Sequence, residues 1–363
     1  MTLQELNKSA IAELPKSYKC YFPDFIKDIF DNYIRELQNL SPQNRLHQEK
    51  YVLISQKLTY VQKLANEIHM AINDYFNGNV KSCYKRLEEV IEEERDLFER
   101  LITSPKDQMT IQNIHPRGLF RIRKIVNPTS QIDRKELFHV PFQYRHNVAT
   151  ARYSIPGLPC LYLSSSLHIA KKELGLRKSL NKVYVSRFEA SPDFNMRILD
   201  FGYQPELLGD WNCQCFDRIV FPRIIFWPLI AACSISVNCQ KATFKPEYIV
   251  PQFLFQIAST LFNFDGIRYF STKVGYERPV NINYAIKVKH IHKTEYCTWL
   301  KDQFLLTTPI LWDEIKSITE QSHSMLLQNE KCQIRQGKKM IDYIETEYNQ
   351  LEQKIETLSL AKI

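Results

Sequence analysis

The apolar pattern of this chain of 363 residues changes near residue 106, and this change most restricts the folds that it can adopt. In residues 1–105, segments such as DFIKDIFDNYIREL repeat apolar residues every three or four positions, which is typical of amphipathic helices. Beyond residue 106, runs rich in β-branched and aromatic residues, such as GLFRIRKIV, PCLYLSS, KVYVSRFEA and VNINYAIKV, are typical of strands. The pattern predicts an α+β protein with a mixed β core and helical flanks.

Three regions follow from this pattern. Residues 1–105 are expected to form a small helical bundle, residues 106–292 a mixed domain, and residues 293–363 a second helical region. In the last region an apolar stripe recurs at spacings of three and four: Ile341, Ile344, Tyr348, Leu351, Ile355 and Leu358. Such a stripe suits a helix that packs on the N-terminal bundle or one that forms a homo-oligomer contact.

The composition restricts the location of the protein and its partners. The net charge of +8 is spread along the chain, so we expect anionic small ligands before nucleic acid. Nine scattered cysteines and an N-terminus without an apolar signal segment indicate a cytoplasmic protein. No apolar run reaches the roughly 18–20 residues of a membrane helix. The nearest, RIVFPRIIFWPLIAACSISV, contains Arg223 and two prolines and is expected to be a buried strand and turn.

Several common catalytic motifs are absent from the sequence. The chain has nine glycines and contains neither GxGxxG nor a P-loop, so a nucleotide would need another kind of phosphate-binding group. GxSxG and HExxH are also missing. The CQC at residues 213–215, taken with Cys233 and Cys239, lacks the usual spacing of a zinc site, so we expect no metal.

The segment TARYSIPGLPCLYLSSSLHIAKKEL, residues 150–174, carries an unusual carboxylate. One of its consecutive serines is a suitable N-cap for the helix that follows. Helical spacing then places Glu173 on the buried side with Ile169 and Ala170, whereas His168 faces away toward solvent. An unpaired buried charge is costly, so Glu173 is expected to have a chemical role.

This segment belongs to a wider set of polar residues in strand-like and helical settings. The set comprises Arg121 in LFRIR, Arg152 and Tyr153 in ARYSIPG, Tyr162 in LYLS, Glu173 in AKKEL and Ser271 in GIRYFST. Their order and local sequence resemble the RES domain family, named for its Arg, Glu and Ser. LFR resembles that family's opening strand, ARYSIPGLPCLYLSSS its GRW/F-N-x-PG-x-P-x-LYLS segment, and DGIRYFS its later serine-bearing strand.

The resemblance covers about 115–290, half of the chain, and it has three departures. Tyr153-Ser154 stands where the family has Trp or Phe followed by Asn. The stretch between Glu173 and Ser271 is long, which implies an insertion near residues 203–245. The two helical flanks lie outside the minimal toxin of the family.

The resemblance also implies a function. RES domains are toxins of bacterial toxin–antitoxin pairs, with a fold similar to that of ADP-ribosyltransferases. It implies that this chain binds NAD⁺ as a substrate, with no resident cofactor, and cleaves the nicotinamide–ribose bond. Growth arrest, an antitoxin partner and a place in a toxin–antitoxin or phage-defence system would follow. It assigns catalysis to Glu173, Arg121 and Ser271, and NAD⁺ binding to a second set: Arg152, Tyr162 and Tyr153.

The residue types suit this chemistry. A carboxylate such as that of Glu173 stabilises the oxocarbenium-like state in which an N-glycosidic bond breaks. Arg121 and Arg152 can bind pyrophosphate through their guanidinium forks, in place of a glycine-rich loop. The ring of Tyr162 can face the nicotinamide, and Ser271 can either bind the ribose or hold the carboxylate.

Three alternatives stay open from the sequence. Arg123 lies on the same strand face as Arg121 and is the alternative arginine. Transfer of ADP-ribose to a protein is an alternative to hydrolysis or phosphorolysis. A non-catalytic binding module is the second alternative, although the presence of the whole residue set argues against it.

Overall fold

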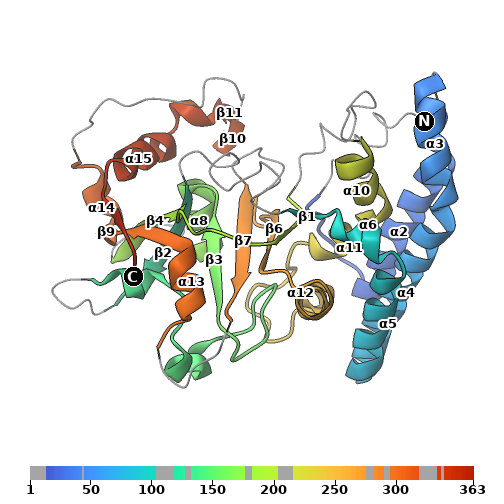
Figure 1. Ribbon diagram of the computed structural model, residues 1–363, viewed down its shortest axis with the longest axis horizontal. Helices are drawn as coiled ribbons and strands as arrows, with labels where there is room; N and C mark the ends of the chain where they lie inside the picture. The colour runs from blue at the N-terminus through green and yellow to red at the C-terminus, as the bar shows by residue number, and fades with distance from the viewer. Residues whose placement is uncertain are drawn as a thin grey trace. The chain divides into compact units, whose positions relative to one another are not determined.

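The computed structural model of the chain describes residues 14–42, 45–103, 118–126, 132–175, 182–202, 216–274, 281–289, 295–318, 333–336 and 339–363 (Figure 1). The chain divides into two compact units. The helical unit contains Met1–Ile102, Ala151–Tyr153 and Leu199–Phe264, and the sheet unit contains Thr103–Thr150, Ser154–Ile198 and Asp265–Ile363.

The helical unit combines the N-terminal helices with a later segment of the chain. Its helices are α2 (Phe22–Gln38), α3 (Arg45–Gln56), α4 (Leu58–Phe76), α5 (Val80–Glu93), α6 (Arg95–Glu99), α10 (Phe221–Ile225), α11 (Trp227–Cys233) and α12 (Ile249–Leu261). A π-helical turn at Phe216–Val220 precedes α10, and a 3-10 turn at Pro246–Tyr248 precedes α12. The predicted helical stripe of the first segment is confirmed, since Ile29, Phe30 and Tyr33 of α2 are buried.

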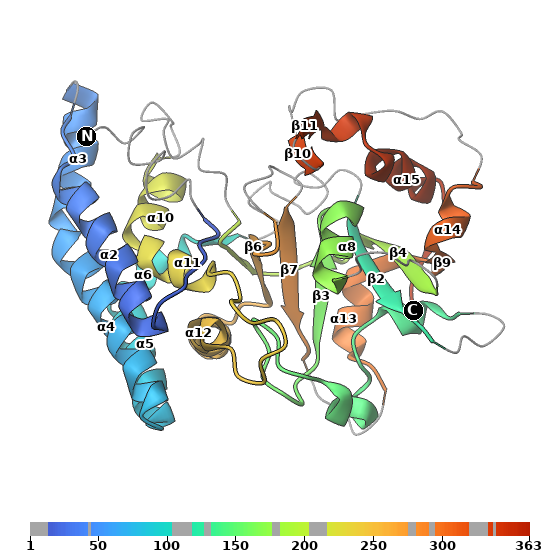
Figure 2. The ribbon, with the colours of Figure 1, turned by 180° about the vertical axis from the view of Figure 1, so that it is seen from behind.

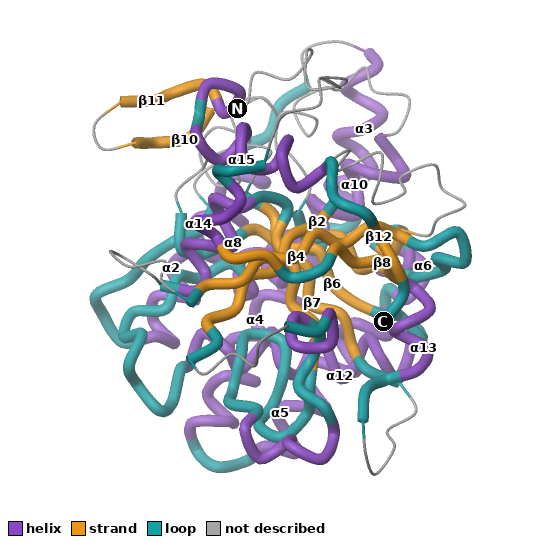
Figure 3. The backbone as a smooth tube through the Cα atoms, turned by 90° about the vertical axis from the view of Figure 1, so that its left-hand side faces the viewer, coloured by secondary structure: helices purple, strands orange, loops and turns teal. Residues whose placement is uncertain are grey.

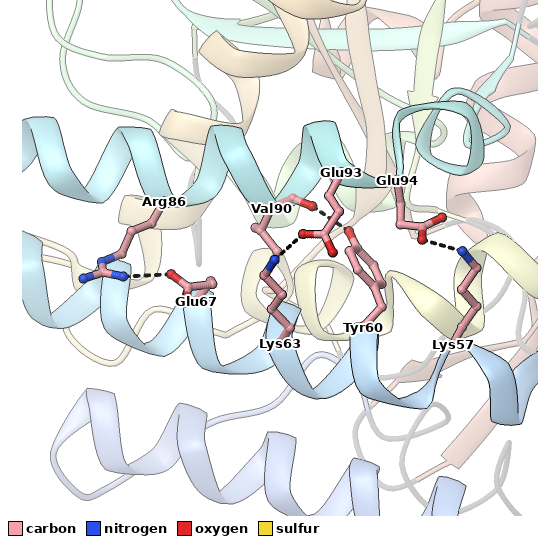
Figure 4. A network of polar contacts seen from close by, with 8 residues as sticks. All are labelled: Lys57, Tyr60, Lys63, Glu67, Arg86, Val90, Glu93 and Glu94. Carbon is pink, nitrogen blue, oxygen red and sulfur yellow. Dashed lines mark hydrogen bonds and ion pairs between the residues drawn. The ribbon is translucent and has the colours of Figure 1, made fainter.

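Polar side chains tie α4 to α5 along their length (Figure 4). Tyr60 donates its hydroxyl to the carbonyl of Val90 at 2.8 Å, and Arg86 donates to Glu67 at 2.9 Å. Lys63 pairs with Glu93, and Lys57 pairs with Glu94 just beyond α5. Glu93 and Glu94, at the end of α5, therefore pair with lysines in or directly before α4.

The segment that was expected to be a buried strand and turn is helical, so that prediction is wrong. Pro222 and Pro228 each stand in the first turn of a helix, α10 and α11, where the missing N–H breaks no helical hydrogen bond. Tyr33 of α2 packs on this segment by stacking on Trp227, with centroids 4.1 Å apart, and by donating to the carbonyl of Ile224. Within the described residues, every helix is too short or too polar to cross a membrane.

The sheet unit holds almost all of the strands. They are β1 (Ile102–Thr103), β2 (Leu119–Lys124), β3 (Cys160–Ser164), β4 (Val183–Ala190), β5 (Ile198–Asp200), β6 (Gly266–Phe270), β7 (Ile282–Lys287), β8 (Phe304–Thr307), β9 (Ile310–Leu311), β10 (Gln333–Gln336), β11 (Lys339–Asp342) and β12 (Leu360–Ala361). Its helices are α8 (Leu167–Leu174), α13 (Thr298–Gln303), α14 (Trp312–Ile315) and α15 (Glu347–Glu356). Short 3-10 turns lie at Arg134–Leu137, Phe142–Asn147 and Tyr343–Glu345.

One large sheet organises this unit, and its strands run in the order β1-β5-β6-β7-β3-β2-β4-β8-β12, with β9 also paired to β4. Figure 3 shows these strands as a twisted sheet in orange. The pairs β6–β7, β7–β3, β3–β2, β2–β4 and β4–β8 are all antiparallel. The prediction of a mixed α+β architecture with a strand-rich core is therefore confirmed.

The two faces of the sheet have different partners. Because successive strand residues point to opposite faces, Leu161 and Leu163 enter one hydrophobic core while Tyr162 and Ser164 face the other side. That other side is covered by α8, which packs on the β2 residue Phe120. The helix therefore lies directly over the polar residues of β3.

The C-terminal region is mixed rather than helical, which corrects the prediction for residues 293–363 (Figure 2). The apolar stripe is not one helix, because Ile341 lies in β11 and Thr346 caps α15 in an extended conformation. Leu351 and Ile355 of α15 pack within the sheet unit, against Phe120 and α8. The expected packing on the N-terminal bundle is therefore wrong, because the contacts of this stripe are to α8 and the sheet.

Candidate active site

Helix α8 delivers Glu173 to the sheet. Ser166 is its N-cap, and the Ser166 hydroxyl accepts a hydrogen bond from the amide of Ile169 at 3.3 Å. Gly175 ends the helix with a φ of +71°, a left-handed conformation that glycine adopts without strain. The short helix therefore starts and stops at fixed residues, and Glu173 lies in its last turn.

Two side chains fix one oxygen of the Glu173 carboxylate. Ser271 donates its hydroxyl to Oε1 at 2.7 Å, and Asn283 donates its amide nitrogen to the same oxygen at 2.7 Å. Lys273 donates to the backbone carbonyl of Glu173 at 2.7 Å and lies 3.5 Å from Oε2. The Glu173 side chain is 32% exposed, so its carboxylate is held in place while one side stays accessible.

Asn283 is itself oriented by a neighbouring strand. Ser164 of β3 lies directly opposite Asn283 of β7 and donates its hydroxyl to Oδ1 at 2.8 Å. With Oδ1 accepting from Ser164, the amide nitrogen of Asn283 is left to donate to Glu173. The hydrogen bonds therefore run in one direction, from Ser164 through Asn283 to Glu173.

Arg121 lies beside these residues, on β2. Its Nη1 donates to the carbonyl of Tyr162 at 2.7 Å, while its Nε is buried without a hydrogen-bond partner in the structure. Burial, followed by the nearby charge of Arg123, lowers the pKa of Arg121 to about 10. Arg123 instead donates to the carbonyl of Glu136 at 2.8 Å, so of the two arginines it is Arg121 that stands next to Tyr162.

These residues surround a cavity of about 220 Å³. Its lining comprises Phe120, Arg121, Ile122, Tyr162, Leu163, Ser164, Ala170, Glu173, Leu174, Tyr269 and Asn283. The volume equals the liquid share of about seven water molecules, at ~30 Å³ each. It suits one flat ring with part of a sugar better than a whole dinucleotide. Arg121 of β2 and Glu173 of α8 therefore both line this small cavity.

The sequence of this chain has a clear relative. Over 345 residues it is 32% identical to the Bacillus subtilis (strain 168) protein named "Putative toxin YopC", in an alignment that covers 90% of this chain and 74% of YopC. The chain belongs to the YopC family. No family model matches the chain, and no solved structure matches it. The YopC relationship extends well beyond residues 115–290, so it includes most of the helical unit and the C-terminal region.

In this YopC-family chain, four of the six predicted site residues lie together. Arg121, Tyr162, Glu173 and Ser271 are joined to one another or to the cavity by the contacts above. The hydroxyl of Tyr162 also lies 3.1 Å from the hydroxyl of Ser154. Of the two roles proposed for Ser271, its geometry is that of a residue that holds the carboxylate.

The other two predicted residues, Arg152 and Tyr153, belong to the helical unit and are not among the residues that line the cavity. The guanidinium of Arg152 donates to the carbonyls of Cys233 and Ile235, at 3.0 and 2.8 Å, and lies over the ring of Tyr248. Tyr153 is 1% exposed and packs near Phe255. In the structure these contacts anchor the segment 151–153 within the helical unit.

Sequence reasoning missed three polar residues of this YopC-family site: Ser164, Lys273 and Asn283. Asn283 offered one signal, since it is an amide in strand β7, INYAIK, where the residues between it and Lys287 are apolar or aromatic. Sequence reasoning also misjudged His168, which is 3% exposed rather than solvent-facing, because Tyr348 of α15 lies over it. No local pattern could reveal that contact, since the two residues are far apart in the chain.

The structure offers no candidate metal site among the residues that it describes, where no three His, Cys, Asp or Glu side chains gather in a ligating arrangement. Cys213 and Cys215 lie outside the described residues. Cys233 is buried in α11, and burial raises the pKa of its thiol to about 12, which disfavours the thiolate that a metal needs.

Proposed function

We propose that this chain is a RES-type toxin that consumes NAD⁺ by cleaving the nicotinamide–ribose bond. The observation that carries the proposal is the partly exposed Glu173 carboxylate, which has one oxygen fixed by two donors beside a cavity that is also lined by Arg121. The name of its relative YopC supports the toxin class. An ADP-ribosyltransferase-like relationship of the sheet is part of the same proposal.

The fixed carboxylate suits the bond that must break. In the proposed reaction the bond from C1′ to the nicotinamide nitrogen breaks, and its electron pair neutralises the positive charge of the ring. Positive charge then develops on the ribose, where a carboxylate held in advance stabilises it without reorganisation. Ser271 and Asn283 both donate hydrogen bonds to Oε1 of Glu173. In the proposed complex, Oε2 is therefore the oxygen that faces the ribose.

Water completes the reaction by adding to C1′ and releasing one proton, which yields ADP-ribose. Phosphate in place of water would give the corresponding sugar phosphate. In either case the acceptor approaches from the accessible side of Glu173, which lies 3.5 Å from the ammonium of Lys273.

Arg121 is proposed to bind a phosphate of the dinucleotide. Its Nε is a buried donor in need of an acceptor, and a guanidinium matches phosphate oxygens better than an ammonium does. The cavity of about 220 Å³ would hold the nicotinamide and part of its ribose next to Tyr162. A neutralising protein, an antitoxin, is the partner that a toxin of this kind requires.

Glu173→Gln tests the proposal, because it removes the charge and keeps the shape. We expect purified wild-type protein to release nicotinamide from NAD⁺, and the variant to be slower by about 10²-fold or more. Glu314→Gln, at an exposed position of α14, is the matched control and should keep the wild-type rate. Equal rates for Glu173→Gln and wild type would refute the proposed mechanism.

The same assay identifies the acceptor when the NAD⁺ is labelled on its adenylate half. Label that stays in small molecules supports hydrolysis or phosphorolysis, and adding or omitting phosphate separates the two. Label that becomes bound to protein would instead support ADP-ribosyl transfer.

A further inference from the structure

We propose that Glu352, on the C-terminal helix α15, is a positioning residue for Glu173, so that the C-terminal region contributes to the proposed active site. The rates predicted below rest on the proposed function, because they are rates of NAD⁺ cleavage. Glu352 lies outside the stretch that resembles the RES domain family, which ends near residue 290.

The Glu352 carboxylate holds the start of α8. Its Oε1 accepts a hydrogen bond from the backbone amide of Leu167, the first residue of α8, at 2.7 Å, and another from the hydroxyl of Tyr343 at 2.5 Å. Glu352 is 3% exposed. Amides in the first turn of a helix have no hydrogen-bond partner within the helix, and this end of the helix dipole is positive. A carboxylate here therefore stabilises α8 both by accepting a hydrogen bond and by its negative charge.

Further contacts from the C-terminal region surround the same helix. The ring of Tyr348 lies 5.0 Å from the ring of His168. The ammonium of Lys171 lies 5.6 Å from the ring centre of Trp312 and 5.5 Å from that of Tyr348. One side of α8 therefore rests on α14 and α15, while Glu173 extends from the helix toward the cavity.

Helix α8 depends on such partners for its position. It has eight residues, fewer than the roughly 12–15 at which an isolated helix becomes even marginally stable in water. Leu167 and Glu173 are six residues apart, which is about 9 Å along a helix at 1.5 Å per residue. A tilt of about 10° at the Leu167 end would move Glu173 by roughly 1.6 Å, and a misplacement of 1 Å can cost about 10²-fold in rate.

Substitutions at Glu352 test the proposal. We expect Glu352→Ala to lower kcat for NAD⁺ cleavage by about 10- to 100-fold with KM changed by less than about twofold, since Glu352 does not line the cavity. Glu352→Gln can still accept from the Leu167 amide and should restore most of the rate. Glu347→Ala is the control, because Glu347 lies on the same helix but pairs with Lys316 at the surface.

A double-mutant comparison separates positioning from general damage. If Glu352 acts through Glu173, then Glu352→Ala should slow the residual reaction of Glu173→Gln by less than about twofold. A full 10-fold or greater loss in that background would overturn the proposal, as would a kcat for Glu352→Ala equal to wild type.

Hydrogen exchange gives a readout that needs no activity. Amides of residues 166–174 should exchange faster in Glu352→Ala than in wild type or Glu347→Ala, by about 10-fold or more at Leu167. Unchanged exchange would overturn the inference. If the wild-type protein does not cleave NAD⁺ but Glu352→Ala still exchanges faster than wild type, the proposed function is refuted and the positioning contact stands. If Glu352→Ala fails to fold, Glu352→Asp, whose carboxylate is one methylene too short to keep the 2.7 Å contact with the Leu167 amide, takes its place in the same measurement.

Discussion

Replacing Arg121 with methionine should make the protein more stable and less active. The guanidinium lies among protein atoms with one bond to the Tyr162 carbonyl, and among the described residues no carboxylate comes within ion-pair distance of it. A charge in that position disfavours folding, because water solvates it better in the unfolded chain. Methionine has a similar length and removes the charge.

The lowered pKa of Arg121 sets the size of this effect. A fall from 12.5 to about 10 corresponds to about 3 kcal/mol, at ~1.36 kcal/mol per pKa unit. This figure is an upper bound, because Arg121 is only partly buried and lines the cavity. Losing the hydrogen bond to Tyr162 offsets about 1 kcal/mol. The free energy of unfolding of Arg121→Met should therefore exceed that of wild type by about 1–2 kcal/mol at neutral pH.

Denaturant unfolding at pH 7.5 measures this difference, and Arg123→Met provides the matched control. Arg123 lies two residues away on the same strand with its side chain 40% exposed, so its replacement should change stability by less than about 0.5 kcal/mol. Under the proposed function Arg121→Met should also raise KM for NAD⁺. An Arg121→Met protein less stable than Arg123→Met would show that the buried guanidinium stabilises the fold, and would refute this reasoning.

Two further predictions concern the site and the sheet core. Asn283→Asp should slow NAD⁺ turnover more than Asn283→Ala does, because a second carboxylate would stand 2.7 Å from Oε1 of Glu173 and raise the pKa of the pair; turnover measured against pH checks this, and equal rates for the two variants would contradict it. His139 is fully buried, and burial lowers its pKa from 6.5 to about 4. As the pH falls, His139 is therefore protonated in the unfolded chain at a higher pH than in the folded protein. The free energy of unfolding should therefore fall by up to about 3 kcal/mol between pH 6.5 and pH 4 through this residue, and urea unfolding of His139→Gln should show a shallower fall.

The sequence predicted the elements of the fold better than their contacts. The strands β2, β3, β4, β6 and β7 were all expected, because each is a short run rich in β-branched, aromatic and other apolar residues. The helix over residues 167–174 was expected from its serine cap. In contrast, the segment RIVFPRIIFWPLIAACSISV was expected to be a buried strand and turn, whereas Pro222 and Pro228 stand in the first turns of helices α10 and α11.

Site residues could be predicted where their own segment of the sequence shows their role. Residues that reach the site from distant segments could not be predicted. Glu173 was identifiable as a carboxylate on the apolar side of a short helix. Asn283 and Lys273 approach Glu173 from 110 and 100 residues further along the chain. The amide of Asn283 stands out in its strand, but neither segment identifies Glu173 as the partner. Arg152 was assigned to phosphate from its surroundings in sequence, whereas its bonds in the structure are to carbonyls 81 and 83 residues away.

The hydrogen bond between Leu167 and Glu352 also has a consequence for synthesis. The two residues are 185 positions apart, and ribosomes add about 5–20 residues per second. The helix that carries Glu173 is therefore made roughly 10–40 seconds before the carboxylate that holds its first turn. During that interval a nascent chain contains Glu173 but not the contact that orients its helix, so a harmful activity at this site would arise late in translation.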